Sequence, residues 1–195
     1  KIGAMEDGKF ADQVADLVFF GTTAPAAPPA ETSGEDGDGE ESSQAKPLDP
    51  IASGERTYTT LAGYRSRLGP EQAERVLYCT DEAGQAGALA LWTGQGAEVL
   101  MADSFIDTQF IPWLEMRHSE LKFQRVDAEL DASLQESESE IKDADGKDSS
   151  EKLRELFKKA LDDGRVTVQV QALKGDNAPA ALILLPEQMR RINDM

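Results

Sequence analysis

The residues that could carry chemistry are few in this chain, and their spacing matches no established site. His118 is the only histidine, which excludes a zinc site built on paired histidines, and no nucleophile motif accompanies it. Gly94-Gln95-Gly96 lacks the third glycine of a phosphate-binding loop and precedes a strand-like run instead of following one. The acidic run from Glu35 to Glu41 lacks the ligand spacing of a calcium-binding loop. We therefore expect no catalytic residue, cofactor-binding residue or metal ligand, and we expect His118 at the surface.

The charge of the chain limits its partners. Asp and Glu total 37 against 20 Lys and Arg, which gives a formal net charge of -17. Such a chain repels phosphate backbones and anionic lipids, so neither nucleic acid nor a membrane is an expected partner. No stretch approaches the roughly 20 apolar residues of a membrane-spanning helix. The single cysteine, Cys79, is expected to be buried and fits a reducing, cytoplasmic compartment.

The middle of the chain predicts a parallel α/β unit. Three strand-like runs, ERVLYCT, AEVLMA and SELKFQRV, alternate with two helix-like runs, EAGQAGALALWTG and SFIDTQFIPWLEM. Short connections of this kind imply parallel strands in a three-layer α/β/α arrangement. We expect a further helix in TTLAGYRSRLG and another over residues 5–20, where apolar residues recur at helical spacing.

Two acidic segments interrupt this pattern. Residues 24–54 combine Pro, Gly and acidic residues with almost no large apolar side chains. Such a composition cannot bury enough surface to offset the entropy lost on ordering. We expect a disordered linker or a long surface insertion at 24–54, and a second acidic linker at 128–148.

The last part of the chain predicts a helix, two strands and a second helix. SSEKLRELFKKALDDG places its apolar residues on one face, RVTVQVQAL alternates as a half-buried strand, and AALILL is a continuous apolar strand. Pro186 then opens a final helix, on one side of which lie Met189, Ile192 and Met195. Methionine adapts to varied apolar partners. This side could therefore contact other proteins or pack on its own domain, and the sequence leaves both readings open.

Four stretches carry motifs in one order along the chain: LVFFGTT, GYRSRLGPEQAERVLYCTDE, GQGAEVLMADSFIDTQFIPWLE and NAPAALILLPEQMRRI. Together they resemble the bacterial form of the ninety-kilodalton heat-shock chaperone family (heat shock protein 90). Phe19 departs from the resemblance, because that family has Arg at this place. The matching residues are Phe20, Thr23, Tyr64, Ser66, Arg67, Leu68, Val76, Leu77, Tyr78, Gly96, Glu98, Val99, Leu100, Ile106, Asp107, Pro179, Met189, Arg191 and Ile192.

The resemblance implies a division of the chain into domains. Residues 1–23 would finish the larger middle subdomain as a helix, and residues 55–127 would form the smaller α/β middle subdomain. Residues 149–195 would begin an α+β C-terminal dimerisation domain, with the segments 24–54 and 128–148 as linkers. Both ends of the chain would then be cuts through a longer protein.

The resemblance also implies a function. Chaperones of this family assist protein folding and the stress response, and they bind ATP and Mg²⁺ in an N-terminal domain that this chain lacks. The chain itself is therefore expected to hold no cofactor and not to be an enzyme. The parent protein would be a homodimer, whereas this fragment, without the last helices of the dimer interface, is expected to be a monomer. Its expected partners are non-native client proteins.

The candidate client-contacting residues are Phe110, Trp113, Met189, Ile192 and Met195. The family often has an aromatic residue two places after the Ile-Asp pair, where this chain has Gln109, so the contact could be shifted to Phe110. Two other classes of function stay open. One is a ligand-binding α/β domain that uses the carboxyl ends of its parallel strands, near Thr80 and Ala102; the other is a structural module that joins two domains.

Overall fold

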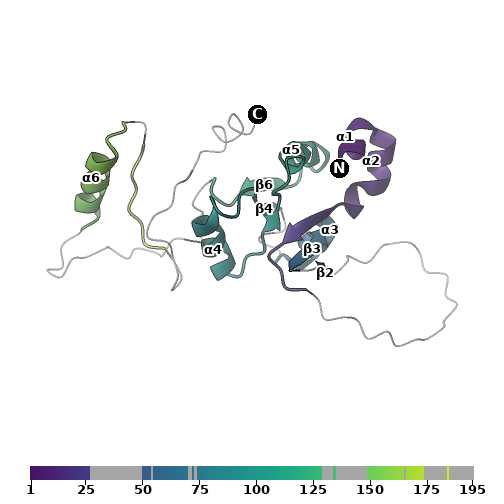
Figure 1. Ribbon diagram of the computed structural model, residues 1–195, viewed down its shortest axis with the longest axis horizontal. Helices are drawn as coiled ribbons and strands as arrows, with labels where there is room; N and C mark the ends of the chain where they lie inside the picture. Colours follow the sequence, from purple (N-terminus) through teal and green to yellow (C-terminus); the bar gives the residue numbers. More distant parts are fainter. Residues whose placement is uncertain are drawn as a thin grey trace.

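The structure is a computed structural model, and it describes residues 1–26, 50–53, 55–69, 72, 74–128, 134, 149–164, 166–173 and 184. Figure 1 shows an α/β body and, apart from it, the helix α6. The helices are α1 (Ile2–Glu6), α2 (Gly8–Val14), the short 3-10 helix η1 (Ala15–Leu17), α3 (Leu61–Arg67), α4 (Ala86–Gly94), α5 (Asp107–Arg117) and α6 (Ser150–Leu161). The strands are β1 (Phe19–Thr22), β2 (Ile51–Ser53), β3 (Arg56–Thr60), β4 (Arg75–Cys79), β5 (Leu100–Met101) and β6 (Lys122–Arg125). None of the described helices is long and apolar enough to cross a membrane.

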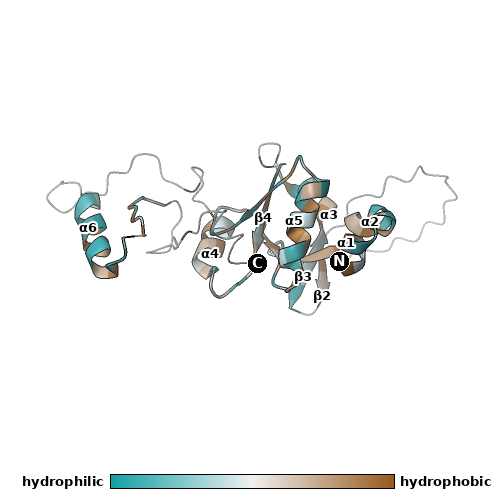
Figure 2. Ribbon diagram, turned by 90° about the horizontal axis from the view of Figure 1, so that it is seen from above, coloured by the Kyte–Doolittle hydropathy of each residue, from teal (hydrophilic) through white to brown (hydrophobic). Residues whose placement is uncertain are grey.

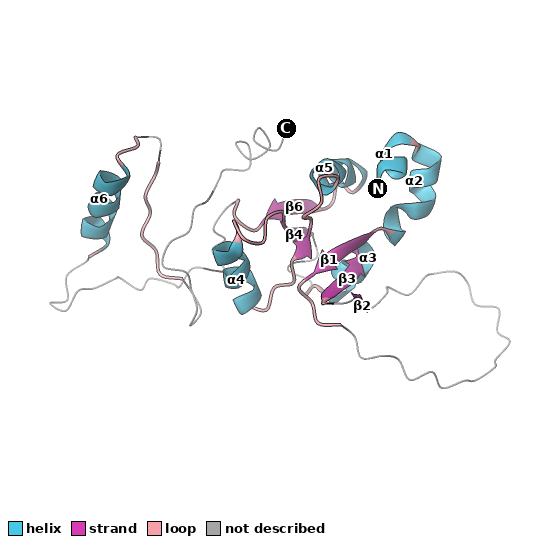
Figure 3. Ribbon diagram, viewed as in Figure 1, coloured by secondary structure: helices cyan, strands magenta, loops and turns pink. Residues whose placement is uncertain are grey.

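The six strands form one mixed sheet in the order β2-β3-β1-β5-β4-β6. The predicted parallel unit is confirmed, because β4 pairs in parallel with both β5 and β6 (Figure 3). The other half of the sheet corrects the expectation of a purely parallel sheet: β1 pairs antiparallel with β3 and β5, and β2 pairs antiparallel with β3. Only two residues separate Ser53 from Arg56, and so short a connection can join only antiparallel strands.

Alternating side chains of β4 divide the core between the two faces of the sheet. Val76 and Tyr78 point into a first cluster, under α3 and α5, whereas Leu77 and Cys79 point into a second cluster, under α4. Helices on both faces confirm the predicted three-layer α/β/α arrangement.

The helix expected over residues 5–20 is broken at Asp7 and is wrong over its last three residues, 18–20. Asp7 breaks the run, since its carboxylate accepts hydrogen bonds from the Lys9 and Phe10 N–H groups and caps α2. The helical part ends at Leu17, and β1 then lies in the middle of the sheet between β3 and β5. Residues 1–23 therefore share one sheet and one core with residues 55–127. The division of the chain into subdomains stays a prediction.

Some residues that the prediction assigned to the two linkers belong to the fold. Residues 51–53, placed in the first linker, form β2, and residues 27–49 lie outside the described residues. At the start of the second linker Ala128 and Leu134 are buried, Leu134 in the second cluster. The other residues from 129 to 148 are not among those described.

The C-terminal part agrees with the prediction only over its first helix. The amphipathic helix is confirmed as α6, which ends where Asp162 takes a left-handed φ of 47°. Val166 to Leu173 run on without a strand, except for an isolated bridge at Leu173, which packs against the second cluster. The predicted second strand and final helix fall outside the described residues, apart from Leu184.

Candidate protein-binding surfaces

Helix α5 carries two of the predicted client-contacting residues, and its burial pattern corrects one of them. Phe110 has 0% of its surface exposed, and its ring centroid lies 6.1 Å from that of Phe20 and 5.0 Å from that of Trp113. A side chain enclosed in this way has no surface to offer to another protein. Phe110 is therefore a core residue, on the inward face that it shares with Ile111 and Leu114.

Trp113 is half-buried and packs against the first cluster. One face of its indole stacks on Phe110, and the Arg117 guanidinium lies 5.2 Å from its ring centroid. Trp113 can therefore offer only part of its ring to a partner. Its first role in this fold is to close the core beside Phe110.

The outward face of α5 exposes an apolar stripe that the sequence prediction missed. Phe105 is 81% exposed and Met116 is 76% exposed, and between them lie the exposed residues Gln109 and Pro112. Spacings of three and four residues place Gln109, Pro112 and Met116 on one side of α5, and Phe105 lies in the turn just before the helix. None of the four carries a charge, although the chain is strongly acidic. We call Phe105, Gln109, Pro112 and Met116 the α5 stripe.

An ion pair fixes the start of α5 and therefore the position of Phe105. The buried Asp107 carboxylate accepts a hydrogen bond from the Ser104 N–H at 3.3 Å and pairs with the Lys1 ammonium. That ammonium in turn lies 4.4 Å from the ring centroid of Phe20. The turn that holds Phe105 outward is thus tied to α1 and to the sheet.

Helix α6 presents a second exposed apolar face. None of its residues is buried; Leu156 is 63% exposed, Phe157 46% and Leu161 52%. Figure 2 shows hydrophilic and hydrophobic residues side by side on this helix. Met189, Ile192 and Met195, the other predicted contacts, lie outside the described residues, so their expected role stays a prediction.

The carboxyl ends of the parallel strands are filled by side chains, which contradicts the ligand site expected near Thr80 and Ala102. The Gln85 amide oxygen accepts the Thr80 N–H at 3.0 Å, and its amide nitrogen donates to Asp127 at 3.3 Å. Asp127 also accepts from the Arg125 guanidinium at 2.9 Å, and Ala102 is 1% exposed. These groups hydrogen-bond to one another, so the described residues at this edge fill the place where the ligand was expected.

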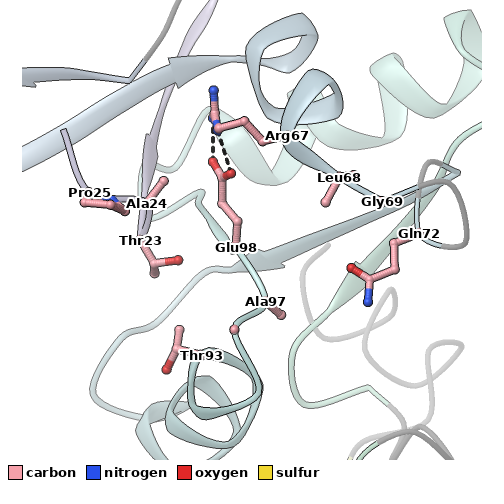
Figure 4. Close-up of a pocket in the computed structure, with 11 residues that line it drawn as sticks. Thr23, Ala24, Pro25, Arg67, Leu68, Gly69, Gln72, Thr93, Ala97 and Glu98 are labelled. Atoms are coloured by element: carbon pink, nitrogen blue, oxygen red, sulfur yellow. Dashed lines mark hydrogen bonds and ion pairs between the residues drawn. The ribbon is translucent and has the colours of Figure 1, made fainter. Parts of the chain in front are cut away.

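A cavity of about 530 Å³ lies at the opposite end, beside the start of β5 (Figure 4). Its charged residues are Arg67 and Glu98, whose side chains form a two-bonded ion pair with N–O distances of 2.9 and 2.7 Å. The pair is anchored on both sides, since Arg67 donates to the Thr59 hydroxyl at 2.8 Å and Glu98 accepts from the Thr22 hydroxyl at 2.6 Å. The arrangement joins α3, β1 and β3 to the start of β5, so its evident role is structural.

The remaining candidate groups are the Cys79 thiol, the His118 imidazole and possible metal ligands. Burial raises the pKa of Cys79 to about 11, so the thiol is protonated and inert at neutral pH, and the predicted burial of Cys79 is confirmed. His118 is half-buried instead of being a free surface residue; its Nδ1 lies 3.5 Å from Glu120, and its Nε2 is buried without a hydrogen-bond partner among the described residues. Within the described part of the chain no cluster of His, Cys, Asp and Glu could hold a metal ion.

The fold and the surface together define the class of protein: an α/β segment of an acidic chain that exposes apolar side chains to solvent. The chain is similar to the chaperone protein HtpG of Bacteroides thetaiotaomicron, with 26% identity over 144 residues that cover 70% of this chain and 21% of the relative. It is similar to the chaperone protein htpG of Bacteroides fragilis strain 638R, with 28% identity over 144 residues and the same two shares. No family model matches the chain.

These matches confirm the resemblance to the ninety-kilodalton heat-shock chaperones that the motifs indicate. The chain spans about a fifth of the length of the curated relatives it matches. What it shares with them is therefore one segment of a much longer protein.

Proposed function

We propose that this chain is a client-binding and domain-coupling part of an ATP-dependent molecular chaperone, and that the α5 stripe contacts non-native proteins. The observation that carries the proposal is the exposure of two large uncharged side chains, Phe105 in the turn before α5 and Met116 near the end of that helix. Large apolar side chains that stay in water on a folded domain mark an interaction site when they lie together.

The size of the stripe suits weak binding to many partners. Full burial of one large apolar side chain contributes roughly 1.5–3 kcal/mol, so Phe105 and Met116 together support a shallow and reversible contact. Methionine adapts its shape to different partners, which favours varied clients over one specific partner. The net charge of -17 keeps a chain with exposed apolar residues from associating with itself.

The rest of the proposal concerns the longer protein. It would bind ATP and Mg²⁺ outside this chain, act as a homodimer in the cytoplasm, and assist folding under stress. This chain alone would hold no cofactor, catalyse no reaction and remain a monomer. A structural role between two domains is compatible with client binding and is part of the same proposal.

The test is a binding titration with a permanently unfolded protein, reduced and alkylated so that it cannot refold. The double variant Phe105→Ser/Met116→Ser is compared with Ile2→Ser/Leu17→Ser, which removes two exposed apolar side chains outside the stripe. We expect the stripe variant to bind about ten-fold more weakly, a loss of about 1.4 kcal/mol, and the control to bind like the parent chain. Equal weakening in both variants would show that the stripe has no special role.

The final helix that the sequence predicts needs its own variant. Met189→Asp/Ile192→Asp would place two charges among the apolar residues of that predicted helix. If the helix belongs to the client site, these changes weaken binding further in the stripe variant. Unchanged affinity would remove Met189, Ile192 and Met195 from the site and leave the stripe as the contact.

A further inference from the structure

The register of the antiparallel strands lines up a second apolar surface on the sheet itself. Ile51 lies opposite Tyr58, Tyr58 opposite Gly21, and Gly21 opposite Met101, so these four residues cross the strands β2, β3, β1 and β5 in one row. Residues directly opposite one another point to the same face of a sheet, and so do residues two apart in one strand. Phe19, two residues before Gly21, therefore lies on the same face as this row, and we call these five residues the open sheet face.

No described helix covers the part of the open sheet face on β2, β3 and β1, whereas Met101, at the end of the row, packs against the second cluster, under α4. Phe19 is 41% exposed and Ile51 48% exposed, although both lie beside the core of the sheet. Figure 3 shows α4 beside β4 and β6 and not over β1 and β3, whereas α3 lies behind these two strands. Gly21, in the middle of the row, is buried and has no side chain; a Cβ there would stand 3.0 Å from the Cβ of Met101, so the Met101 side chain lies against the backbone at this point.

The free edge of the sheet argues against a partner that adds a strand. The Thr23 N–H donates to the Val99 carbonyl across β1 and β5. In each strand, successive residues turn their N–H and C=O groups alternately to one neighbouring strand and to the other. Following the printed register from β1 through β3 to β2, Ala52 is the one residue of β2 whose N–H and C=O point away from β3. Pro50, which would be next to do so, has no N–H. A sheet face that is covered on one half only calls instead for a helix as its missing layer.

The acidic groups beside the open sheet face favour a partner with positive charge. Arg56, which lies next to Tyr58 on the same side of β3, is already paired with Asp103 at 2.7 Å. The hydrogen bond to Asp103 and the negative charges of Asp103 and Glu82 raise the pKa of Arg56. Glu55 is exposed in the adjoining turn, so among the described residues at this rim the acidic groups Glu55, Glu82 and Asp103 outnumber the basic group of Arg56.

We propose that the open sheet face is a docking site for an amphipathic helix of a partner protein, with Lys or Arg beside its apolar stripe. The site goes beyond the proposed function, because its occupant is a folded helix and none of its residues belongs to the α5 stripe. A result that contradicts one of the two sites therefore leaves the other site unaffected.

The test uses three synthetic peptides on the whole chain: a Leu/Lys amphipathic helix, a Leu/Glu helix with the same apolar stripe, and a scrambled Leu/Lys peptide without a stripe. The Leu/Lys helix is expected to bind more tightly than the other two. Phe19→Ser/Ile51→Ser should weaken its binding about ten-fold, since two large apolar contacts are lost. The matched variant Phe105→Ser/Met116→Ser should leave the binding unchanged.

Methyl NMR of the unaltered chain gives a second measurement that needs no variant to fold. The Leu/Lys helix should shift the methyl signal of Met101, which lies in the open sheet face, and leave that of Met116 in place. A shift at Met116 alone would overturn the proposal. So would equal binding of the scrambled peptide, equal binding of the Leu/Glu helix, or full binding by Phe19→Ser/Ile51→Ser.

Two further outcomes would assign the face to another occupant and overturn the proposal in that way. Sedimentation could show a dimer that Phe19→Ser/Ile51→Ser abolishes, which would make a second copy the occupant. Alternatively, Leu156→Ser/Phe157→Ser could shift the Met101 signal without any peptide, which would make α6 of the same chain the occupant.

Discussion

Phe110→Ala is the substitution that separates the core of α5 from its exposed stripe. Phe110 is fully buried between the rings of Phe20 and Trp113, so its removal leaves a cavity that the packed sheet below cannot fill. Removal of a buried Phe side chain destabilises proteins by about 3–5 kcal/mol. The free energy of unfolding of a domain is only about 5–15 kcal/mol, so the variant should lose a large part of its stability.

The assay is urea unfolding followed by circular dichroism, with Phe105→Ala as the matched control. The two residues are both Phe, five positions apart, and differ in exposure: 0% for Phe110 against 81% for Phe105. Phe105→Ala should change the free energy of unfolding by no more than about 0.5 kcal/mol, as surface substitutions usually do. Its binding of the unfolded client should nevertheless fall.

One result would refute this reasoning directly. If Phe110→Ala cost less than about 1 kcal/mol and weakened client binding, Phe110 would be at the surface, as the sequence first suggested. The inward and outward sides of α5 would then be exchanged, and the α5 stripe would not exist as described.

Three further predictions test the interior. Burial in the fold raises the pKa of Tyr64 from 10.0 to about 12. Because the unfolded chain loses the Tyr64 proton at lower pH than the folded chain, the free energy of unfolding should fall as the pH rises between these two values, and it should fall less steeply in Tyr64→Phe. The single cysteine should react with a thiol reagent at pH 8 only as fast as the chain unfolds, whereas fast labelling of the folded chain would contradict its burial. A double-mutant cycle on Arg67 and Glu98 should give a coupling of about 1–3 kcal/mol, whereas the exposed pair Arg56–Asp103 should show no measurable coupling.

The sequence predicted the parallel half of the sheet well because its signals are local. The runs that became β4, α4, β5, α5 and β6 each show a clear hydrophobic period between breaks, and short connections leave little choice of topology. The antiparallel half was missed because β1 and β2 are short and gain their stability from distant partners. Phe19–Thr22 follows directly on a helix and pairs with residues beyond residue 55, a contact that no local pattern reveals.

The error on α5 has a different cause. The spacing of Phe105, Gln109, Pro112 and Met116 was available in the sequence, but so was that of the buried set, and both contain a Phe. What decides between them is the rotation of the helix about its axis, which the Asp107–Lys1 ion pair and the packing of Phe110 on Phe20 set. Both interactions join residues about a hundred positions apart. The exposed stripe therefore follows from tertiary contacts.

The acidic segment 27–49 offers a last prediction, because its ends attach it to the open sheet face. It contains seven acidic residues against one lysine, and the chain enters it after β1 and leaves it into β2, two strands of that face. Charge tethered near a binding site speeds the arrival of an oppositely charged partner, but it adds little to contacts that form only after docking. Exchange of the acids between residues 31 and 41 for their amides should therefore slow the association of the Leu/Lys helix at low salt and leave its dissociation rate unchanged. Stopped-flow fluorescence measures both rates, and a faster dissociation would mean that the segment itself holds the bound helix.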